Sequence, residues 1–138
     1  MFGSFDTSTS ALSAYRVRMD IIAGNMANLH TTRNAAGQSE PYQRRVALFA
    51  AGAAGSPDGR GVRIDRIVND PSPPRLVHDP GHPDAQREGP DAGYVYYPNV
   101  NPVVEMVDMI AATRAYEANV TAFEAAKTIM GSALRLIA

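Results

Sequence analysis

The sequence predicts a mainly α-helical protein: long N- and C-terminal helices packed as an antiparallel coiled coil or helical bundle, with a small central β-hairpin module and Pro/Gly-rich loops. Apolar residues recur at alternating intervals of three and four near both ends of the chain. Nine of the ten prolines and eight of the eleven glycines lie between positions 37 and 100, which excludes long helices there. Short apolar runs within that stretch indicate strands.

The first helix is expected from Thr7 to about Leu29, because hydroxyl side chains at positions 7–10 offer N-caps just before an apolar seam. Asn25 lies one position from this seam, where a buried Asn costs stability but commonly fixes helix register. Asn28 could fix the register in the same way or could lie at the end of the helix, a position that Asn also favours. The seam consists of Leu12, Tyr15, Met19, Ile22, Met26 and Leu29.

The second helix is expected from Asn101 to Ile137, with Asn101 as N-cap and Pro102 as the first helical residue. Its seam is Met109, Ala112, Tyr116, Asn119, Phe123, Ala126, Met130, Ala133 and Ile137. A second apolar set lies on other sides of the helix: Val103, Val107, Ile110, Val120, Ile129, Leu134 and Leu136. One partner helix cannot cover both sets, so we expect several helical neighbours.

Between the helices we expect two strands, Tyr42 to Ala50 and Val62 to Asn69, joined by a flexible connector over 51–61 as a long-looped hairpin. Tyr42, Val46 and Leu48 share one face of the first strand, and Val62, Ile64 and Val68 share one face of the second. Residues 76–77 and 94–97 are expected to add short edge strands. The chain is thus divided into 1–36 (N-terminal helical arm), 37–100 (central β/loop module) and 101–138 (C-terminal long helix), the two helices forming one coiled-coil domain.

Composition limits the chemistry that the chain can perform. Thirteen basic and fourteen acidic residues give a net charge of −1, which argues against nucleic-acid binding. The absence of Cys excludes disulfides, thiol nucleophiles and Cys-ligated zinc. The start resembles no cleaved secretory signal, and no apolar stretch is long enough to span a membrane. Arg44 and Arg45 are expected to be ordinary solvated charges, because neighbouring strand residues point to opposite faces.

The segment 78–84 is the one that looks like a set of metal ligands. His78, Asp79, His82 and Asp84 lie within seven residues, but intervening Pro and Gly forbid a helix that would align the two imidazoles. The favoured interpretation is a rigid turn whose side chains bond the local backbone, and no metal or other cofactor is expected.

Two separated stretches resemble the bacterial flagellar basal-body rod protein family. Residues 11–28, with Ala-Leu-Ser-Ala and later Ile-Ala-Gly-Asn-Met-Ala-Asn, match its N-terminal pattern, and residues 105–120, Glu-Met-Val-Asp-Met-Ile through Ala-Asn-Val, match its C-terminal pattern. Residues 76–83 and 93–101 bring the chain closest to the C-type proximal rod proteins. It departs from them at His78, where Tyr is usual, at Leu29-His30, and in a longer stretch at 86–92.

The resemblance implies a structural, non-enzymatic subunit of the proximal rod, the drive shaft that crosses the periplasm. Such subunits assemble through their terminal helices, transmit torque and line the export channel, and they are exported by the flagellar apparatus without a cleaved signal peptide. The implied partners are further copies, other proximal and distal rod subunits, the hook–basal body adaptor protein and the export apparatus, without membrane insertion.

Seam positions and family patterns together give the residues expected to serve assembly and helix packing: Leu12, Tyr15, Met19, Ile22, Asn25, Met26, Asn28, Met106, Met109, Ala112, Arg114, Tyr116, Asn119, Val120, Phe123, Met130 and Ile137. Two alternatives remain open from the sequence. One is a soluble coiled-coil adaptor or secretion chaperone, which would form a discrete dimer. The other is a metal-dependent enzyme that uses the His and Asp side chains of 78–84.

Overall fold

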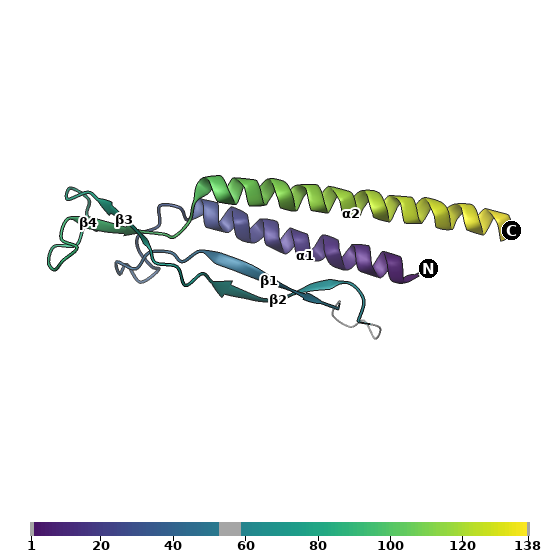
Figure 1. The fold of residues 1–138 in the computed structure, drawn as a ribbon, viewed down its shortest axis with the longest axis horizontal. Helices are drawn as coiled ribbons and strands as arrows, with labels where there is room; N and C mark the ends of the chain where they lie inside the picture. The colour runs from purple at the N-terminus through teal and green to yellow at the C-terminus, as the bar shows by residue number, and fades with distance from the viewer. Residues whose placement is uncertain (1, 53–58, 138) are drawn as a thin grey trace.

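The computed structural model describes residues 2–52 and 59–137 and shows an elongated molecule (Figure 1). Its elements are α1 (Phe2–Ala27), β1 (Arg45–Ala51), β2 (Val62–Asn69), β3 (Arg75–His78), β4 (Tyr94–Tyr97) and α2 (Pro102–Ile137). The helices lie side by side and antiparallel, so both termini are at one end, and the β3–β4 sheet lies at the other. The expectation of a mainly helical chain with a small β module is confirmed. Neither described helix has a stretch apolar enough to cross a membrane.

Helix α1 is the middle layer of three. It packs against α2 on one side and against the β1–β2 hairpin on the other, as Figure 1 shows. The buried hydrophobic side chains of the described residues are few and mostly small: Ala11, Ala14, Ile22, Val95, Val100 and Ala112. Small residues let the backbones approach closely, but each buries little apolar area, so the core of a single chain is thin.

Helix α1 begins at Phe2, so the predicted start at Thr7 is wrong. The hydroxyls expected to cap the helix are instead bonded to the preceding turn: Thr7 Oγ1 donates to the Gly3 carbonyl at 2.8 Å, and Ser10 Oγ donates to the Thr7 carbonyl at 2.7 Å. The Phe5 ring packs edge-on against Phe123 of α2, with 5.1 Å between centroids. This tertiary contact favours helix where local sequence favours a cap.

Helix α2 begins as the sequence predicted. Asn101 Oδ1 accepts a hydrogen bond from the Val103 N–H at 3.0 Å, which is N-cap geometry, and Pro102 is the first helical residue. α2 has 36 residues and α1 has 26. Because Phe5 lies beside Phe123, α2 extends past the start of α1 from about residue 128. We call residues 128–137 the free end of α2.

The predicted hairpin is confirmed as an antiparallel pair in which Arg45 is opposite Asn69 and Ala51 is opposite Val62. The predicted start of its first strand at Tyr42 is wrong, because β1 begins at Arg45 and the Tyr42 hydroxyl is instead bonded to Asn25.

The register of the hairpin shifts between Leu48 and Phe49. The centre of the Phe49 ring lies 5.7 Å from that of Tyr15 of α1, and Phe49 at 38% and Leu48 at 36% are about equally exposed. Most of the predicted connector falls on residues 53–58, outside the described residues. On either side of them, Gly52 N donates to the Gly61 carbonyl at 2.9 Å.

The short strands expected near 76 and 94 are confirmed, and they pair with each other in a second antiparallel sheet, with Leu76 opposite Tyr96. The turn between them bonds its own backbone, as the favoured interpretation of 78–84 predicted: Asp79 Oδ1 accepts from Gly81 N at 3.2 Å and His82 Nδ1 accepts from Asp84 N at 3.1 Å. Among the described residues, no three His, Asp or Glu side chains converge as a metal site would require.

Asp84 connects this turn to the segment that follows α1. Its side chain is buried, accepts a 2.7 Å hydrogen bond from Thr32 Oγ1, and forms an ion pair with Arg33. The hydrogen bond from Arg33, followed by that from Thr32, lowers the pKa of the Asp84 carboxyl below its ordinary value. This cluster fixes the position of the β3–β4 turn relative to the end of α1.

Because the pKa of Asp84 is lowered on folding, its ionised form stabilises the protein above the unfolded pKa of about 4, and the stabilisation is lost as the pH falls through the folded value. We therefore expect Asp84→Asn to melt below wild type at pH 7, and the difference to shrink as the pH falls below about 5. Thermal unfolding followed by circular dichroism across this range measures it. Asp20→Asn, on the exposed side of α1, is the control, and a pH-independent difference for Asp84→Asn would contradict the assignment.

Candidate assembly surfaces and the polar junction that positions them

A buried polar cluster joins the helices to the hairpin, and Asn25 is at its centre. Asn25 is 1% exposed, and its amide makes four hydrogen bonds. Its Nδ2 donates to the Arg45 carbonyl at 2.9 Å and to Glu105 Oε2 at 3.1 Å, while its Oδ1 accepts from Arg45 N and Tyr42 Oη, both at 2.9 Å. The amide therefore pairs with Arg45 as a neighbouring strand would, at the start of β1.

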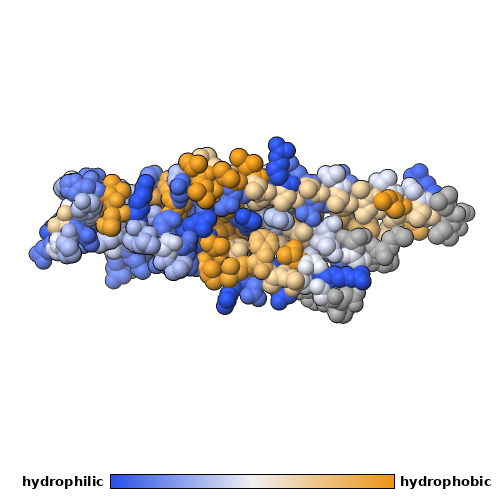
Figure 2. All heavy atoms as spheres, viewed as in Figure 1, coloured by the Kyte–Doolittle hydropathy of each residue, from blue (hydrophilic) through white to orange (hydrophobic). Residues whose placement is uncertain are grey.

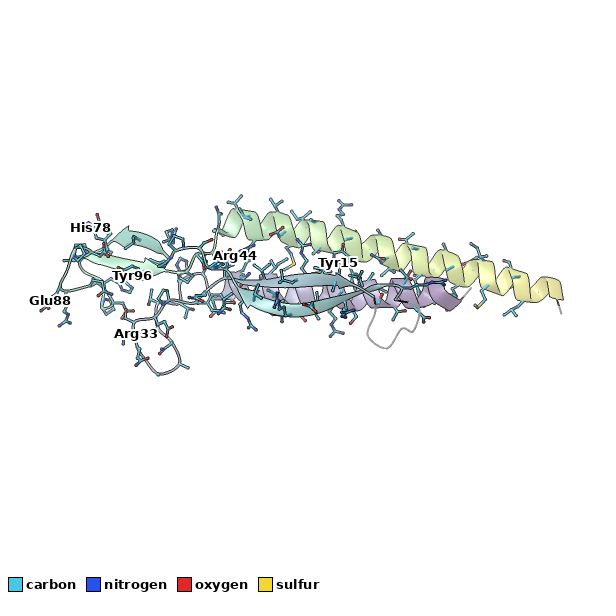
Figure 3. All side chains as sticks on the ribbon, turned by 60° about the horizontal axis from the view of Figure 1, so that its bottom comes forward. Tyr15, Arg33, Arg44, His78, Glu88 and Tyr96 are labelled. Atoms are coloured by element: carbon cyan, nitrogen blue, oxygen red, sulfur yellow. The ribbon has the colours of Figure 1, made fainter. Side chains whose placement is uncertain are left out.

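Glu105 and Arg44 form the charged part of the cluster. Glu105 is fully buried, and its Oε1 accepts a 2.6 Å hydrogen bond from Arg44 Nε. The Arg44 guanidinium also lies 3.4 Å from Asp108 Oδ2 and 3.5 Å from Asp70 Oδ2. Burial alone would lower the pKa of Arg44, but Glu105, Asp70 and Asp108 together raise it. We call Asn25, Arg44, Glu105 and Asp108 the polar junction; Figure 3 places Arg44 where the helices meet the hairpin.

The junction extends to two further segments. Arg18 Nη2 donates to Asp108 Oδ1 at 3.3 Å, and its guanidinium lies 5.9 Å from the centre of the Phe49 ring. Asn99, just before α2, accepts a 2.8 Å hydrogen bond from Arg44 N, and its Nδ2 donates to the carbonyl of Asp70 at 3.2 Å. Segments far apart in the sequence are thus held at one point.

The sequence identified only part of this junction. Asn25 is buried, which is the environment that a register-fixing Asn beside the seam requires. The expectation that Arg44 is an ordinary solvated charge is wrong, because its side chain is 21% exposed and is paired with Glu105. Glu105 at the start of a helix has an adequate local explanation in the helix dipole, so nothing in the sequence indicated that it is buried.

The predicted packing residues of α1 differ in burial. Ile22 and Asn25 are buried, whereas Met26 is 37% exposed. The buried positions upstream are Ala11 and Ala14, each one position before a member of the predicted seam. The seam members Leu12, Tyr15 and Met19 are half-buried. Asn28 follows the last residue of α1, and its Nδ2 donates to the Gly24 carbonyl at 2.8 Å, so it serves the helix end.

On α2, the predicted seam lies on the less exposed side of the helix. Ala112 is fully buried, while the following seam members are half-buried: Met109, Tyr116, Asn119, Phe123 and Met130. Asn119 Nδ2 donates to Ala115 within its own helix, at 2.7 Å. Val120 is half-buried, Met106 and Arg114 are exposed, and the side chain of Ile137 lies outside the described residues.

The second apolar set of α2 is largely exposed. The first turns of the helix carry what we call the α2 patch, a group of five apolar side chains that are 46–62% exposed: Val103, Val104, Met106, Val107 and Ile110. On the free end, Ile129 is 64% and Leu134 is 62% exposed. Figure 2 shows apolar side chains gathered over the start of α2 and a smaller apolar spot toward its far end. A lone chain leaves these surfaces uncovered.

The accessible area leads to the same conclusion. The chain exposes 9170 Å², whereas a compact monomer of 14.8 kDa would expose about 7,000 Å². The excess is about 2,200 Å², and each partner in a standard interface buries about 800 Å². The elongated shape therefore offers area for more than one protein neighbour.

Comparison with known proteins finds relatives that match almost the whole length of this chain. A family model described as "Flagella basal body rod protein" matches residues 5–33, and one described as "Flagellar basal body rod FlgEFG protein C-terminal" matches residues 91–136. The flagellar basal-body rod protein FlgC of Borreliella burgdorferi is 41% identical over 150 residues, covering 99% of this chain and 97% of the relative. FlgC of Bacillus subtilis is 44% identical over 149 residues, covering 98% and 97%. FlgC of Yersinia enterocolitica is 40% identical over 132 residues, covering 96% and 94%.

We expect Asn25→Ala to lower the free energy of unfolding by about 2–3 kcal/mol, because it leaves buried groups of Arg45, Tyr42 and Glu105 without a partner. Denaturant unfolding of the purified chain measures this. Asn119→Ala is the control, since its side chain bonds only within α2, and it should cost less than about 1 kcal/mol. Equal losses in the two variants would show that the junction is not specially important.

Proposed function

The chain belongs to the flagellar basal-body rod protein family of the FlgC type, and from this premise we propose that its helices pack with neighbouring rod subunits and carry torque along the shaft. The protein is a structural component of the bacterial flagellar basal body. Membership of this family favours a structural role over the two alternatives drawn from the sequence, a dimeric adaptor or secretion chaperone and a His/Asp metal-dependent enzyme.

The observation that carries the proposal is the uncovered α2 patch, together with the excess accessible area. Covering even a few hundred Å² of apolar surface at about 25 cal/mol per Å² supplies several kcal/mol per contact. That is comparable with the stability of a small domain, so the thin core of one chain is completed by its neighbours.

Transmission of torque requires subunits that do not bend at the base of their helices. The polar junction supplies this property, because Asn25 and Glu105 join α1, α2 and the start of β1 through short, buried hydrogen bonds. Buried polar contacts are satisfied in one arrangement only, which favours a single geometry over neighbouring ones. The same geometry presents α2 along the long axis of the molecule.

We assign helix packing within the assembly to the predicted residues that one chain leaves half-covered or exposed, in coiled-coil-like contacts with neighbouring helices. In α1 these include Leu12 and Met26, and in α2 Met106 and Phe123. The partners are further copies and other proximal and distal rod subunits, with the hook–basal body adaptor protein and the export apparatus. The site of action is the rod crossing the periplasm, around the export channel, reached without a cleaved signal peptide.

We expect Val107→Glu to abolish motility, because it places a charge in the α2 patch where a neighbouring subunit would exclude water. The side chain is 61% exposed in the single chain, so the purified variant should keep the wild-type circular dichroism spectrum and melting temperature. Swimming in soft agar, in cells carrying only the variant gene, is the measurement. Thr121→Glu, which is exposed on α2 beyond the patch, should stay motile. Normal swimming of Val107→Glu would contradict the proposed role of the patch.

A further inference from the structure

The two halves of the β1–β2 hairpin are attached to the helices in different ways. At the base of the hairpin, residues 45–48 and 66–69, the Asn25 amide binds both the N–H and the C=O of Arg45. Arg44, directly before β1, is paired with two carboxylates of α2. The base therefore leaves the helices only if buried groups of the polar junction lose their partners.

The outer half of the hairpin, residues 49–51 and 62–64, is attached more weakly. Among the described residues, one hydrogen bond joins it to α1: the Val62 N–H donates to Ser10 Oγ at 3.2 Å. Both groups are uncharged, and a bond of this kind contributes less to stability than bonds to charged groups do.

The Phe49 ring adds contacts where the two halves meet. Its centre lies 5.7 Å from that of the Tyr15 ring and 5.9 Å from the guanidinium carbon of Arg18, both on α1. The ring nevertheless stays 38% exposed. Because Phe49 is the first residue of the outer half, these contacts hold its near end and leave its far end to the bond with Ser10.

Packing between the outer half and α1 is incomplete. A groove of about 290 Å³ lies between them, lined mainly by apolar groups that include Ala14, Val17, Val62 and Ile64. Apolar atoms beside a hollow lack neighbours on one side, so they lose dispersion contacts there. Moving the outer half away from α1 therefore costs less than separating two well-packed surfaces.

A β-bulge separates the two halves. Leu48 is opposite Arg66 and Phe49 is opposite Ile64, so Asp65 has no partner in β1. A bulge interrupts the ladder of hydrogen bonds and bends the strand that carries it. The hairpin can therefore bend at this point while the strand pairs on either side stay intact.

We propose that the outer half of the hairpin is a flap that opens away from α1 by bending at the bulge, with the Ser10 hydroxyl as its latch. The base stays fixed on the polar junction, because opening it would leave buried charged groups without partners. The flap opens while the rest of the chain remains folded, as local openings of weakly held segments do.

This device goes beyond the proposed rod function, since it is a property of the single chain. Opening uncovers the side of α1 that carries Ala14 and Val17 and gives the chain a second shape there. The relative placement of the two helices does not change, because the junction that determines it lies at the other end of the hairpin.

Engineered thiols test the flap, because the natural chain has no Cys. Ala14 is 3% exposed and lies under the flap, whereas Ala112 is 0% exposed on α2, which packs against α1. The purified variants Ala14→Cys and Ala112→Cys would be treated with a chromogenic disulfide reagent in buffer and in low concentrations of urea. We expect Ala14→Cys to react at least about tenfold faster, since its exposure breaks one neutral hydrogen bond and not the fold. Its rate should also depend less on urea, because local opening exposes little surface.

Removing the latch provides the second measurement. Ser10→Ala added to Ala14→Cys should raise the reaction rate about two- to tenfold, the range that corresponds to one neutral hydrogen bond. The same substitution added to Ala112→Cys should leave that rate unchanged. Thr7→Ala is the matched control, since the Thr7 hydroxyl bonds only to the Gly3 carbonyl of its own helix, and it should not alter the rate of Ala14→Cys.

Two outcomes would overturn the proposal. Equal rates with equal urea dependence for the two thiols would show that the hairpin leaves α1 only when the whole chain unfolds. A fast rate for Ala14→Cys that Ser10→Ala does not change would show that the reagent enters through the groove without any opening. Both results concern the purified chain and leave the proposed rod function standing.

Discussion

The hydrogen bonds that Asn25 and Glu105 share determine how the rest of the structure is arranged. Both side chains are buried, and between them they contact α1, α2, and the strand entry at Arg44 and Arg45. Removing such groups from water is expensive unless every donor and acceptor is satisfied. Here the Asn25 amide uses all four of its hydrogen bonds, which is achieved in one relative placement of the three segments. The junction therefore contributes geometric specificity that apolar contacts between small residues would not supply.

That specificity matters because the apolar core is too thin to impose a geometry by shape alone. Ala11, Ala14 and Ala112 let the two helices approach closely, but alanine side chains interdigitate little. The molecule combines a weak apolar interior with a strict polar junction and an apolar exterior along α2. Part of the free energy that stabilises the protein is therefore gained only when subunits assemble. The direction in which α2 points is already determined in the single chain. Such a chain can exist as a single molecule before assembly and can still add to the rod in one orientation.

Sequence reasoning identified the parts of the fold that depend on local patterning. The start of α2 at Asn101-Pro102 follows from cap chemistry, and the hairpin follows from alternating apolar residues between Pro- and Gly-rich segments. The short strands at 75–78 and 94–97 were expected as edges, and the sequence did not predict that they pair with each other in a separate sheet. The start of α1 was missed because the contact between Phe5 and Phe123 joins residues that no local pattern connects. Arg44 was missed for the same reason: its partner Glu105 lies 61 positions away, and strand periodicity alone suggests a solvated charge. The buried stripe of α1 departs from the predicted seam because α1 has a second partner, the hairpin, on its other side.

The surfaces were easier to predict than the junction, for a physical reason. A helix with more apolar residues than one partner helix can cover must leave some of them exposed, and this excess can be counted in the sequence. Val103, Val107 and Ile110 could therefore be recognised without knowing what covers them. A buried charged residue can be recognised from the sequence only if the residue that pairs with it in the fold is known. In a protein that completes its packing with other subunits, the sequence therefore shows where the chain needs neighbours more clearly than it shows how the chain holds its own shape. Substitutions in the α2 patch and in the polar junction should therefore have different effects. Those in the patch affect assembly itself, and those in the junction affect the orientation in which assembly occurs.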